Sequence, residues 1–246
     1  MSLCRFHLPA ADWSSGVLRG EEAEHAVRVL RKRAGDLIEV FDGTGRVAVA
    51  EITQVEKGVL SFTVQSVMQH QRNGLPVHLI APLIKGQAFE WMLEKAVELG
   101  AASIQPVITE RCVVHLDADQ AEKKRVKWCR LMLESAKQCH TPFLPELHAV
   151  AKWATVMQAD LSDGCNFIAA LDEKRQAIPH RLGSGPRPAC VRLAIGPEGD
   201  FTPDELAQAL QAGFQAITLG PLILRAETAA IAGLAVLTHE ARNVEA

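Results

Sequence analysis

The chain has 246 residues, of which 48% are hydrophobic and 22% charged, and its formal net charge at pH 7 is −3. This length and composition are typical of a globular protein with one large domain, or with one medium domain and a small one, and the chain has no low-complexity tract. No apolar run is long enough to cross a bilayer and the N-terminal residues lack the apolar core of a signal peptide, so we expect a cytoplasmic protein without membrane contact.

Residues 1–70 are predicted to form a small β-rich module. A short helix is expected over Glu21–Leu30. Apolar residues then alternate with polar ones in three predicted strands, Ile38–Phe41, Val47–Val55 and Leu60–Val67. Asp42-Gly43 between the first two is a strong hairpin signal. The polar stretch 69–76, which contains Gly and Pro, is predicted to be a linker.

From residue 75 to the end, strand-like and helix-like patterns alternate. Strands are predicted at Val77–Ala81, Ile104–Ile108, Phe167–Leu171, Val191–Ile195 and Ala216–Leu219. Helices are predicted at Gln87–Leu99, Asp119–Cys139, Thr202–Ala212 and Ala226–Arg242. Such alternation indicates a mainly parallel sheet with helices on both faces.

Two glycine-rich loops, Ile195–Phe201 and Leu219–Ala229, each follow a predicted strand and open a predicted helix. Glycine lets the backbone approach a ligand closely, and proline keeps the bend rigid. The first loop ends where Thr202 and Glu205 predict a capping box, with Pro203 at the first helical position. Strand, glycine loop and helix, used twice, predict a small-molecule site at the carboxyl edge of the sheet.

The absence of other motifs argues against a P-loop NTPase, a classical dinucleotide-binding domain, a disulfide framework and a metal site. There is no GxxxxGK[ST] P-loop, and no GxGxxG follows the first α/β strands. The six cysteines are scattered, so no disulfide framework is expected. Cys112 and His115 have a metal-like spacing, but no second ligand pair matches them, and we expect no metal.

Two basic clusters stand out against the acidic net charge. One contains Arg28, Arg31, Lys32 and Arg33, and the other contains Lys123, Lys124, Arg125, Lys127 and Arg130. For either cluster alone, a solvated helix face is the favoured interpretation. Together they permit RNA binding without establishing it.

At the glycine loops the chain resembles the bacterial 16S ribosomal RNA N3-methyluridine methyltransferases of the SPOUT (α/β-knot) superfamily. The C-terminal matches are Gly196-Pro197-Glu198-Gly199, Leu219-Gly220-Pro221, Ile223-Leu224-Arg225 and Glu227-Thr228-Ala229. The middle matches are Glu94-Lys95, Glu98-Leu99-Gly100, Glu110-Arg111-Cys112, Lys124 and Trp128. The N-terminal matches are Arg5-Phe6, His25, Val29-Leu30-Arg31, Gly35-Asp36 and Phe41-Asp42-Gly43.

The resemblance implies a fold, a cofactor and partners. The fold would be a PUA-like β-barrel over 1–70, which binds RNA, followed by a trefoil-knot, parallel-sheet α/β methyltransferase domain over 75–246. The donor would be S-adenosylmethionine (SAM), the substrate a uridine of 16S ribosomal RNA in the small subunit, and the assembly a homodimer. The residues expected to bind the cofactor are Leu171, Ile195, Gly196, Gly199, Leu219, Gly220, Leu224 and Thr228. Those expected to bind RNA are Arg28, Arg31, Lys32, Arg33 and Lys124.

Four residues depart from the family pattern. Asp200 stands where a second glycine is usual, and Leu222 where arginine is common. Lys137 and Thr141 replace the usual glutamate and arginine, in a segment where contacts with RNA or a partner are expected. None of them removes the cofactor motif.

Methylation of uridine N3 requires the N3 proton to leave, and the resulting anion spreads charge onto both ring oxygens. An arginine can stabilise that charge without itself titrating. Arg225, beside the second loop, and Arg5 are therefore the predicted catalytic residues, while Glu198 or Glu227 could accept the proton. Two other functions stay open at this point: a SPOUT enzyme acting on transfer RNA, and a non-catalytic ribosomal RNA-binding assembly factor.

Overall fold

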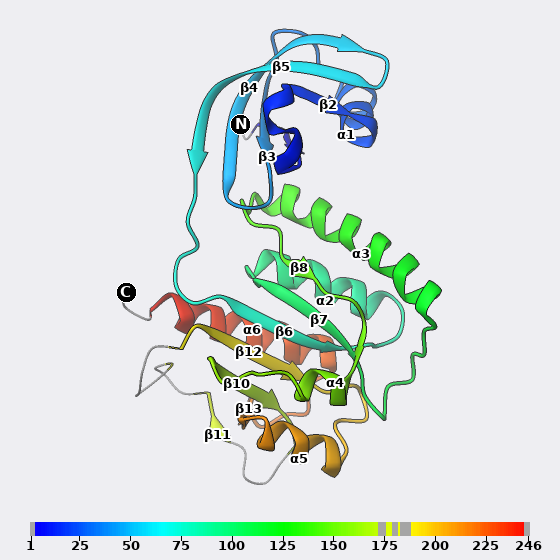
Figure 1. Ribbon diagram of the computed structural model, residues 1–246, viewed down its shortest axis with the longest axis vertical. Coiled ribbons are helices and arrows are strands. Elements are labelled where there is room, and N and C mark those ends of the chain that lie inside the picture. Colours follow the sequence, from blue (N-terminus) through cyan, green and yellow to red (C-terminus); the bar gives the residue numbers. More distant parts are fainter. Residues whose placement is uncertain (1–2, 172–175, 179–181, 183–187, 244–246) are drawn as a thin grey trace. The chain divides into compact units, whose positions relative to one another are not determined.

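The computed structural model describes residues 3–171, 176–178, 182 and 188–243. The chain divides into two compact units (Figure 1). The N-terminal unit consists of Met1–Arg72 and Leu133–Leu144, and the α/β unit consists of Asn73–Met132 and Pro145–Ala246. One segment in the middle of the chain therefore packs with the N-terminal residues.

A five-stranded sheet of order β1-β3-β4-β5-β2 forms the frame of the N-terminal unit. Its strands are β1 (Arg5–His7), β2 (Val17–Arg19), β3 (Leu37–Phe41), β4 (Arg46–Glu56) and β5 (Val59–Gln69). A 3₁₀ turn covers Ala10–Ser15, and α1 (Gly20–Glu24) continues into a π-helical turn at His25–Val29. The predicted helix is thus in the expected place, but its second half has the wider π winding.

The predicted Asp-Gly hairpin joins β3 to β4. The Asp42 carboxylate accepts hydrogen bonds from the backbone N–H groups of Thr44 (2.7 Å) and Arg46 (3.2 Å). Gly43 has a φ of 78°, a conformation that glycine adopts without steric cost. The strands alternate as expected, so one face supplies the core, which includes Phe6, Leu18, Ile38, Val40, Ile52 and Leu60.

Residues 133–144 are bonded to this sheet at several points. Backbone hydrogen bonds join Gly45 to Pro142 (3.0 Å) and Leu144 to Gly43 (2.8 Å). The ammonium group of Lys137 lies 2.8 Å from a carboxylate oxygen of Glu22, and the Lys137 side chain is only 9% exposed. The departures at Lys137 and Thr141 therefore lie in a packed part of the N-terminal unit.

A parallel sheet of order β11-β13-β10-β12-β6-β7-β8 forms the centre of the α/β unit, with β9 also pairing with β7. Its strands are β6 (Val77–Pro82), β7 (Ser103–Ile108), β8 (Glu146–Leu147), β9 (Ala151–Lys152), β10 (Gly164–Ala169), β11 (Gln176–Ala177), β12 (Cys190–Ile195) and β13 (Phe214–Thr218). The helices are α2 (Gln87–Glu98), α3 (Ala118–Cys139), α4 (Trp153–Met157), α5 (Pro203–Gln211) and α6 (Ala226–Arg242). Every pairing described in this sheet is parallel, as predicted.

Successive residues of each strand supply the two faces of this sheet. On β12, Ala194 joins the core beneath α4 and α5, together with Trp153 and Ala209. Its neighbour Leu193 points the other way, because a Cβ added to Gly233 of α6 would lie 2.7 Å from its side chain. The sheet is therefore covered on both faces, and glycine lets α6 pack close to β12.

Candidate functional site

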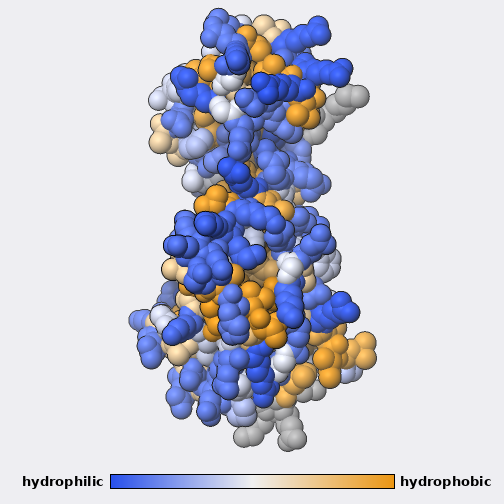
Figure 2. Space-filling model, turned by 90° about the vertical axis from the view of Figure 1, so that its right-hand side faces the viewer, coloured by the Kyte–Doolittle hydropathy of each residue, from blue (hydrophilic) through white to orange (hydrophobic). Residues whose placement is uncertain are grey.

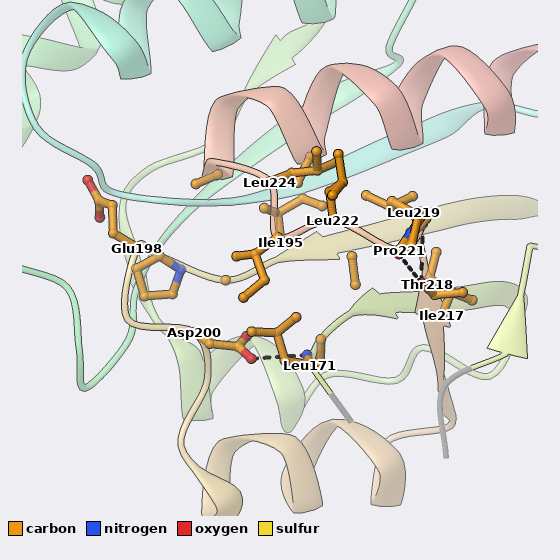
Figure 3. Close-up of a pocket in the computed structure, with 18 residues that line it drawn as sticks. Leu171, Ile195, Glu198, Asp200, Ile217, Thr218, Leu219, Pro221, Leu222 and Leu224 are labelled. Carbon is orange, nitrogen blue, oxygen red and sulfur yellow. Dashed lines mark hydrogen bonds between the residues drawn. The ribbon is translucent and has the colours of Figure 1, made fainter. Parts of the chain in front are cut away.

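The two glycine loops leave neighbouring parts of one sheet edge. β10 pairs with β12 on one side and with β13 on the other, all in parallel, so the carboxyl ends of the three strands lie together. A pocket opens at that edge (Figure 3). It is lined by Ala169–Leu171, Ile195–Glu198, Asp200, Ile217–Leu224, Ala226 and Ala229. The sequence-predicted site is thus one pocket with a wall from each loop.

The first loop folds back on itself through Asp200. The N–H of Asp200 donates to the carbonyl of Pro197 at 2.9 Å, which closes a tight turn. A Cβ on Gly196 would lie 2.9 Å from Asp200 Oδ1 and 3.2 Å from the Phe201 ring, so a larger residue there would have to displace the Asp200 carboxylate. Asp200 Oδ2 accepts a hydrogen bond from the N–H of Leu171 at 3.0 Å. The carboxylate therefore ties the first loop to the loop that follows β10.

Arg111 supports the same loop. Its Nη1 donates to the carbonyl oxygens of Gly199 (2.7 Å) and Phe201 (3.2 Å). A Cβ on Gly199 would lie 3.2 Å from the Cβ of Arg111, so glycine allows this close packing. A planar guanidinium that bonds two carbonyls at once fixes the path of the backbone.

The predicted capping box is confirmed at the start of α5. Thr202 Oγ1 accepts from the N–H of Glu205 (3.3 Å), and the Glu205 carboxylate accepts from the N–H of Thr202 (2.9 Å). The other oxygen of Glu205 accepts from the N–H of Glu110 at 2.7 Å. Because Glu205 is buried and fully engaged, it fixes the point at which the first loop becomes helix.

The second loop begins with a turn held by Thr218. Its hydroxyl donates to the carbonyl of Gly220 (2.9 Å) and accepts from the N–H of Gly220 (3.2 Å). Gly220 has a φ of 127°, and a Cβ there would meet no atom within 4 Å. The pocket wall is therefore bare backbone at this point. Leu222 and Ile223, further along the loop, are 76% and 79% exposed.

Two family models match the chain. Residues 71–238 match the RNA methyltransferase domain, and residues 18–65 match the RNA methyltransferase PUA domain. The chain belongs to this RNA methyltransferase family. The resemblance inferred from the sequence is therefore confirmed, and the parallel-sheet methyltransferase fold with an N-terminal PUA domain is the expected class.

Individual relatives of the family cover almost the whole chain. Ribosomal RNA small subunit methyltransferase E of Bacillus subtilis is 29% identical over 229 residues, which is 91% of this chain and 89% of the relative. Its namesake from Synechocystis is 34% identical over 211 residues, which is 85% of this chain and 67% of the relative. The solved structure of that methyltransferase from Neisseria gonorrhoeae, bound to SAM, has a TM-score of 0.85 at 30% identity and covers 97% of this chain and 98% of its own. A Legionella pneumophila protein solved with bound SAM gives the same four values.

Most residues predicted to bind the cofactor line the pocket. Those that do are Leu171, Ile195, Gly196, Leu219, Gly220 and Leu224. Gly199 instead packs against Arg111, and Thr228 is exposed in the first turn of α6, outside the lining. The wall supplied by Ala169, Ala170, Ile217 and Thr218 was not predicted from the sequence. Their position at the ends of predicted strands was the signal that could have identified them.

The two predicted catalytic arginines have different surroundings. Arg225 is the N-cap residue of α6, exposed, between the lining residues Leu224 and Ala226. Arg5 belongs to the N-terminal unit, and its side chain is 6% exposed. It pairs with Glu39 and donates to the carbonyl of Thr141 at 2.8 Å. Both catalytic roles stay predictions, and Arg5 has an evident structural one.

The residues predicted to bind RNA lie on the surface of two different units. Arg28, Arg31 and Arg33 are exposed at and after the π-helical turn, and Lys32 is half-buried. Lys124 belongs to the α/β unit, where its ammonium group lies 5.9 Å from the centre of the Trp128 ring. Other cations of the second cluster are paired with acids, since Arg125 bonds Glu122 and Lys127 bonds Glu90.

Within the described ranges, no helix combines the length and the apolar character needed to cross a membrane. Among the same residues, no three His, Cys, Asp or Glu side chains are grouped so that they could hold a metal ion.

Proposed function

We propose that this protein transfers the methyl group of SAM to N3 of a specific uridine in the 16S ribosomal RNA of the small ribosomal subunit. The observation that carries the proposal is the pocket built by both glycine loops at the carboxyl edge of the parallel sheet, in a chain of the RNA methyltransferase family. Relatives named for methylation of small-subunit ribosomal RNA, and neighbours solved with SAM, support the substrate and the cofactor.

The lining of the pocket suits SAM. Ile195, Leu219 and Leu224 provide apolar walls for a flat base, and the bare backbone at Gly220 leaves room beside it. The six predicted cofactor residues that line the pocket are the ones we expect to hold SAM. When bound, SAM supplies a methyl group made electrophilic by a positively charged sulfur.

Arg225 is the residue we assign to the uracil ring. It directly follows the pocket wall and is exposed, as a side chain that must reach a large RNA substrate has to be. Its fixed positive charge would stabilise the negative charge that develops on the uracil oxygens when the N3 proton leaves. Glu198, in the pocket lining, or Glu227, in the first turn of α6, would accept the proton.

The rest of the proposed machinery brings RNA to the pocket. We assign RNA backbone contacts to the basic residues after the π-helical turn and to Lys124, because cations of this kind neutralise phosphates.

The protein would act in the cytoplasm as a homodimer. Exposed apolar side chains in the α/β unit, among them Leu222, Ile223 and Val236, support a surface covered by a second copy, and Figure 2 shows hydrophobic side chains gathered on one face of that unit.

The test uses small ribosomal subunits from a strain that lacks this gene. Incubation with the protein and SAM, followed by nuclease digestion and mass spectrometry, should yield one N3-methyluridine in 16S ribosomal RNA. Arg225→Ala should lower the rate by at least about 100-fold, as expected for loss of transition-state charge stabilisation, and Arg225→Lys should recover part of it. Lys152→Ala, which removes an exposed cation elsewhere in the α/β unit, is the matched control.

Three other outcomes would change the proposal. Methylation of transfer RNA, or of a ribose, would replace the proposed substrate. Tight binding to ribosomal RNA without SAM binding would indicate a non-catalytic assembly factor. Near-normal turnover by Arg225→Ala would remove Arg225 from the mechanism.

A further inference from the structure

The pocket has acidic side chains and, among the described lining residues, no basic one. Its two carboxylates are Glu198 and Asp200. In Figure 3 the Glu198 carboxylate points away from the other labelled side chains, whereas Asp200 lies beside Leu171, across the pocket from Leu222 and Leu224. Asp200 is thus the negative charge held within the pocket wall.

Asp200 is also held in an unusual backbone conformation. Its φ is 59°, in the left-handed region, where glycine is at ease and aspartate and asparagine are tolerated better than other residues. The turn to Pro197 and the hydrogen bond from Leu171 keep it there. Strained residues of this kind cluster at ligand sites, where the surrounding structure maintains them. A side chain at this position therefore carries a backbone strain that glycine would avoid.

Among the described residues, neither nearby arginine forms an ion pair with the Asp200 carboxylate. Arg111 packs against Gly199, with its guanidinium bonded to the carbonyls of Gly199 and Phe201. Arg225 is exposed and is not part of the lining. Around Asp200 the walls are apolar, with Ile195 and Leu171 in the lining, and a charge acts more strongly there than in open water.

We propose that Asp200 makes the pocket select a cationic ligand over a neutral ligand of the same shape, and so favours SAM over its demethylated product, S-adenosylhomocysteine. This inference rests on the proposed function. The two molecules share the adenosine and the amino acid, and they differ by the methyl group and the positive charge on sulfur. Methyl transfer removes that charge, so the same carboxylate that helps to bind the donor would hold the product less tightly.

The test measures binding and does not require turnover. Calorimetric titration with SAM and with S-adenosylhomocysteine gives the ratio of the two dissociation constants for the wild type and for two variants. Asp200→Asn keeps the shape, the tolerance of a left-handed φ and an oxygen for the Leu171 N–H, and removes only the charge. Asp200→Gly removes charge and side chain together but relaxes the backbone. Asp204→Asn removes an exposed carboxylate from the first turn of α5 and is the matched control.

Both Asp200 variants should lower the preference for SAM over S-adenosylhomocysteine by about fivefold, the size expected for one partly exposed ion pair. The wild-type preference should weaken with added salt, and the control should keep the wild-type ratio. An equal change in both affinities would overturn the proposal, because it would assign Asp200 to loop geometry alone. If one Asp200 variant binds neither ligand, the ratio of the two dissociation constants in the other variant tests the proposal. If the wild type binds neither ligand, the proposed function fails instead.

Discussion

In the N-terminal unit, the half-buried carboxylate of Glu22 accepts hydrogen bonds from two other half-buried residues. The Glu22 carboxylate accepts from the N–H of His7 (3.0 Å) and from the ammonium group of Lys137 (2.8 Å). Burial works against the charge on Lys137, but hydrogen bonds to Glu134 and Glu22 outweigh it and raise the pKa of Lys137. Lys137 of α3 is therefore linked to Glu22 of α1.

His7 gives this cluster a dependence on pH. Burial lowers the pKa of His7 and outweighs the opposing effect of Glu22 and Asp42. The unfolded chain therefore takes up a proton at a higher pH than the folded one, so stability is lost as the pH falls below about 6.5. We expect the free energy of unfolding to fall between pH 7.5 and 5.5, and to fall less in His7→Gln. Urea unfolding at several pH values measures this, and parallel pH profiles would refute it.

Helix α5 begins with a capping box in which Thr202 and Glu205 bond each other's backbone N–H groups. Phe201, the last residue of the preceding loop, comes directly before the N-cap residue Thr202. The centre of its ring lies 4.7 Å from that of Trp153. The indole N–H of Trp153 in turn donates to the carbonyl of Glu205 at 3.1 Å. Only Phe201 and Thr202 separate the first residue of α5 from Asp200 in the pocket lining.

Loss of the cap should affect both stability and the pocket. Thr202→Ala should cost about 1 kcal/mol, the usual value for an N-cap. Glu205→Ala should cost more, about 2–3 kcal/mol, because two N–H groups lose their acceptor in a buried place. Urea unfolding followed by tryptophan fluorescence measures the loss, and titration with S-adenosylhomocysteine should show weaker binding. Asp204→Ala, in the same turn but exposed, should change little. Equal losses in Glu205→Ala and Asp204→Ala would contradict this account.

The elements that could be predicted are those with long periodic patterns or complete end signals. The range of α6 is the predicted one, and α2 ends before Gly100, whose φ is 81°. The short elements β1, β2, β8, β9, β11 and α4 were missed, since two to five residues carry no readable period. The π winding at His25–Val29 was missed because it has no separate sequence pattern. For the site, glycine and helix-cap signals identified both loops. Arg111 was named from the sequence only as a match to the family, and its support of the first loop is seen only in its contacts.

At the scale of the whole molecule, the division into units differs from the order of the chain. The change in composition at the polar stretch 69–76 predicts a domain boundary there. The compact N-terminal unit, however, also includes Leu133–Leu144. Pairings such as Thr44 with Phe143 join residues about a hundred positions apart, and local patterns carry no information about them. The functional division at 70 and 75 therefore stays a prediction.

An isolated fragment tests this division. Residues 1–72 alone would lack the acceptor for the Gly45 N–H and the segment that covers Gly43, Arg5 and Glu22. We expect this fragment to be much less stable than the same strands in the full chain, because four polar groups, two of them charged, lose a partner at once. Hydrogen exchange of the β4 amides compares the two directly. A fragment in which residues 130–146 are joined to 1–72 by a glycine–serine linker should recover protection. Equal protection in the bare fragment and the full chain would instead support an independent domain that ends near residue 70.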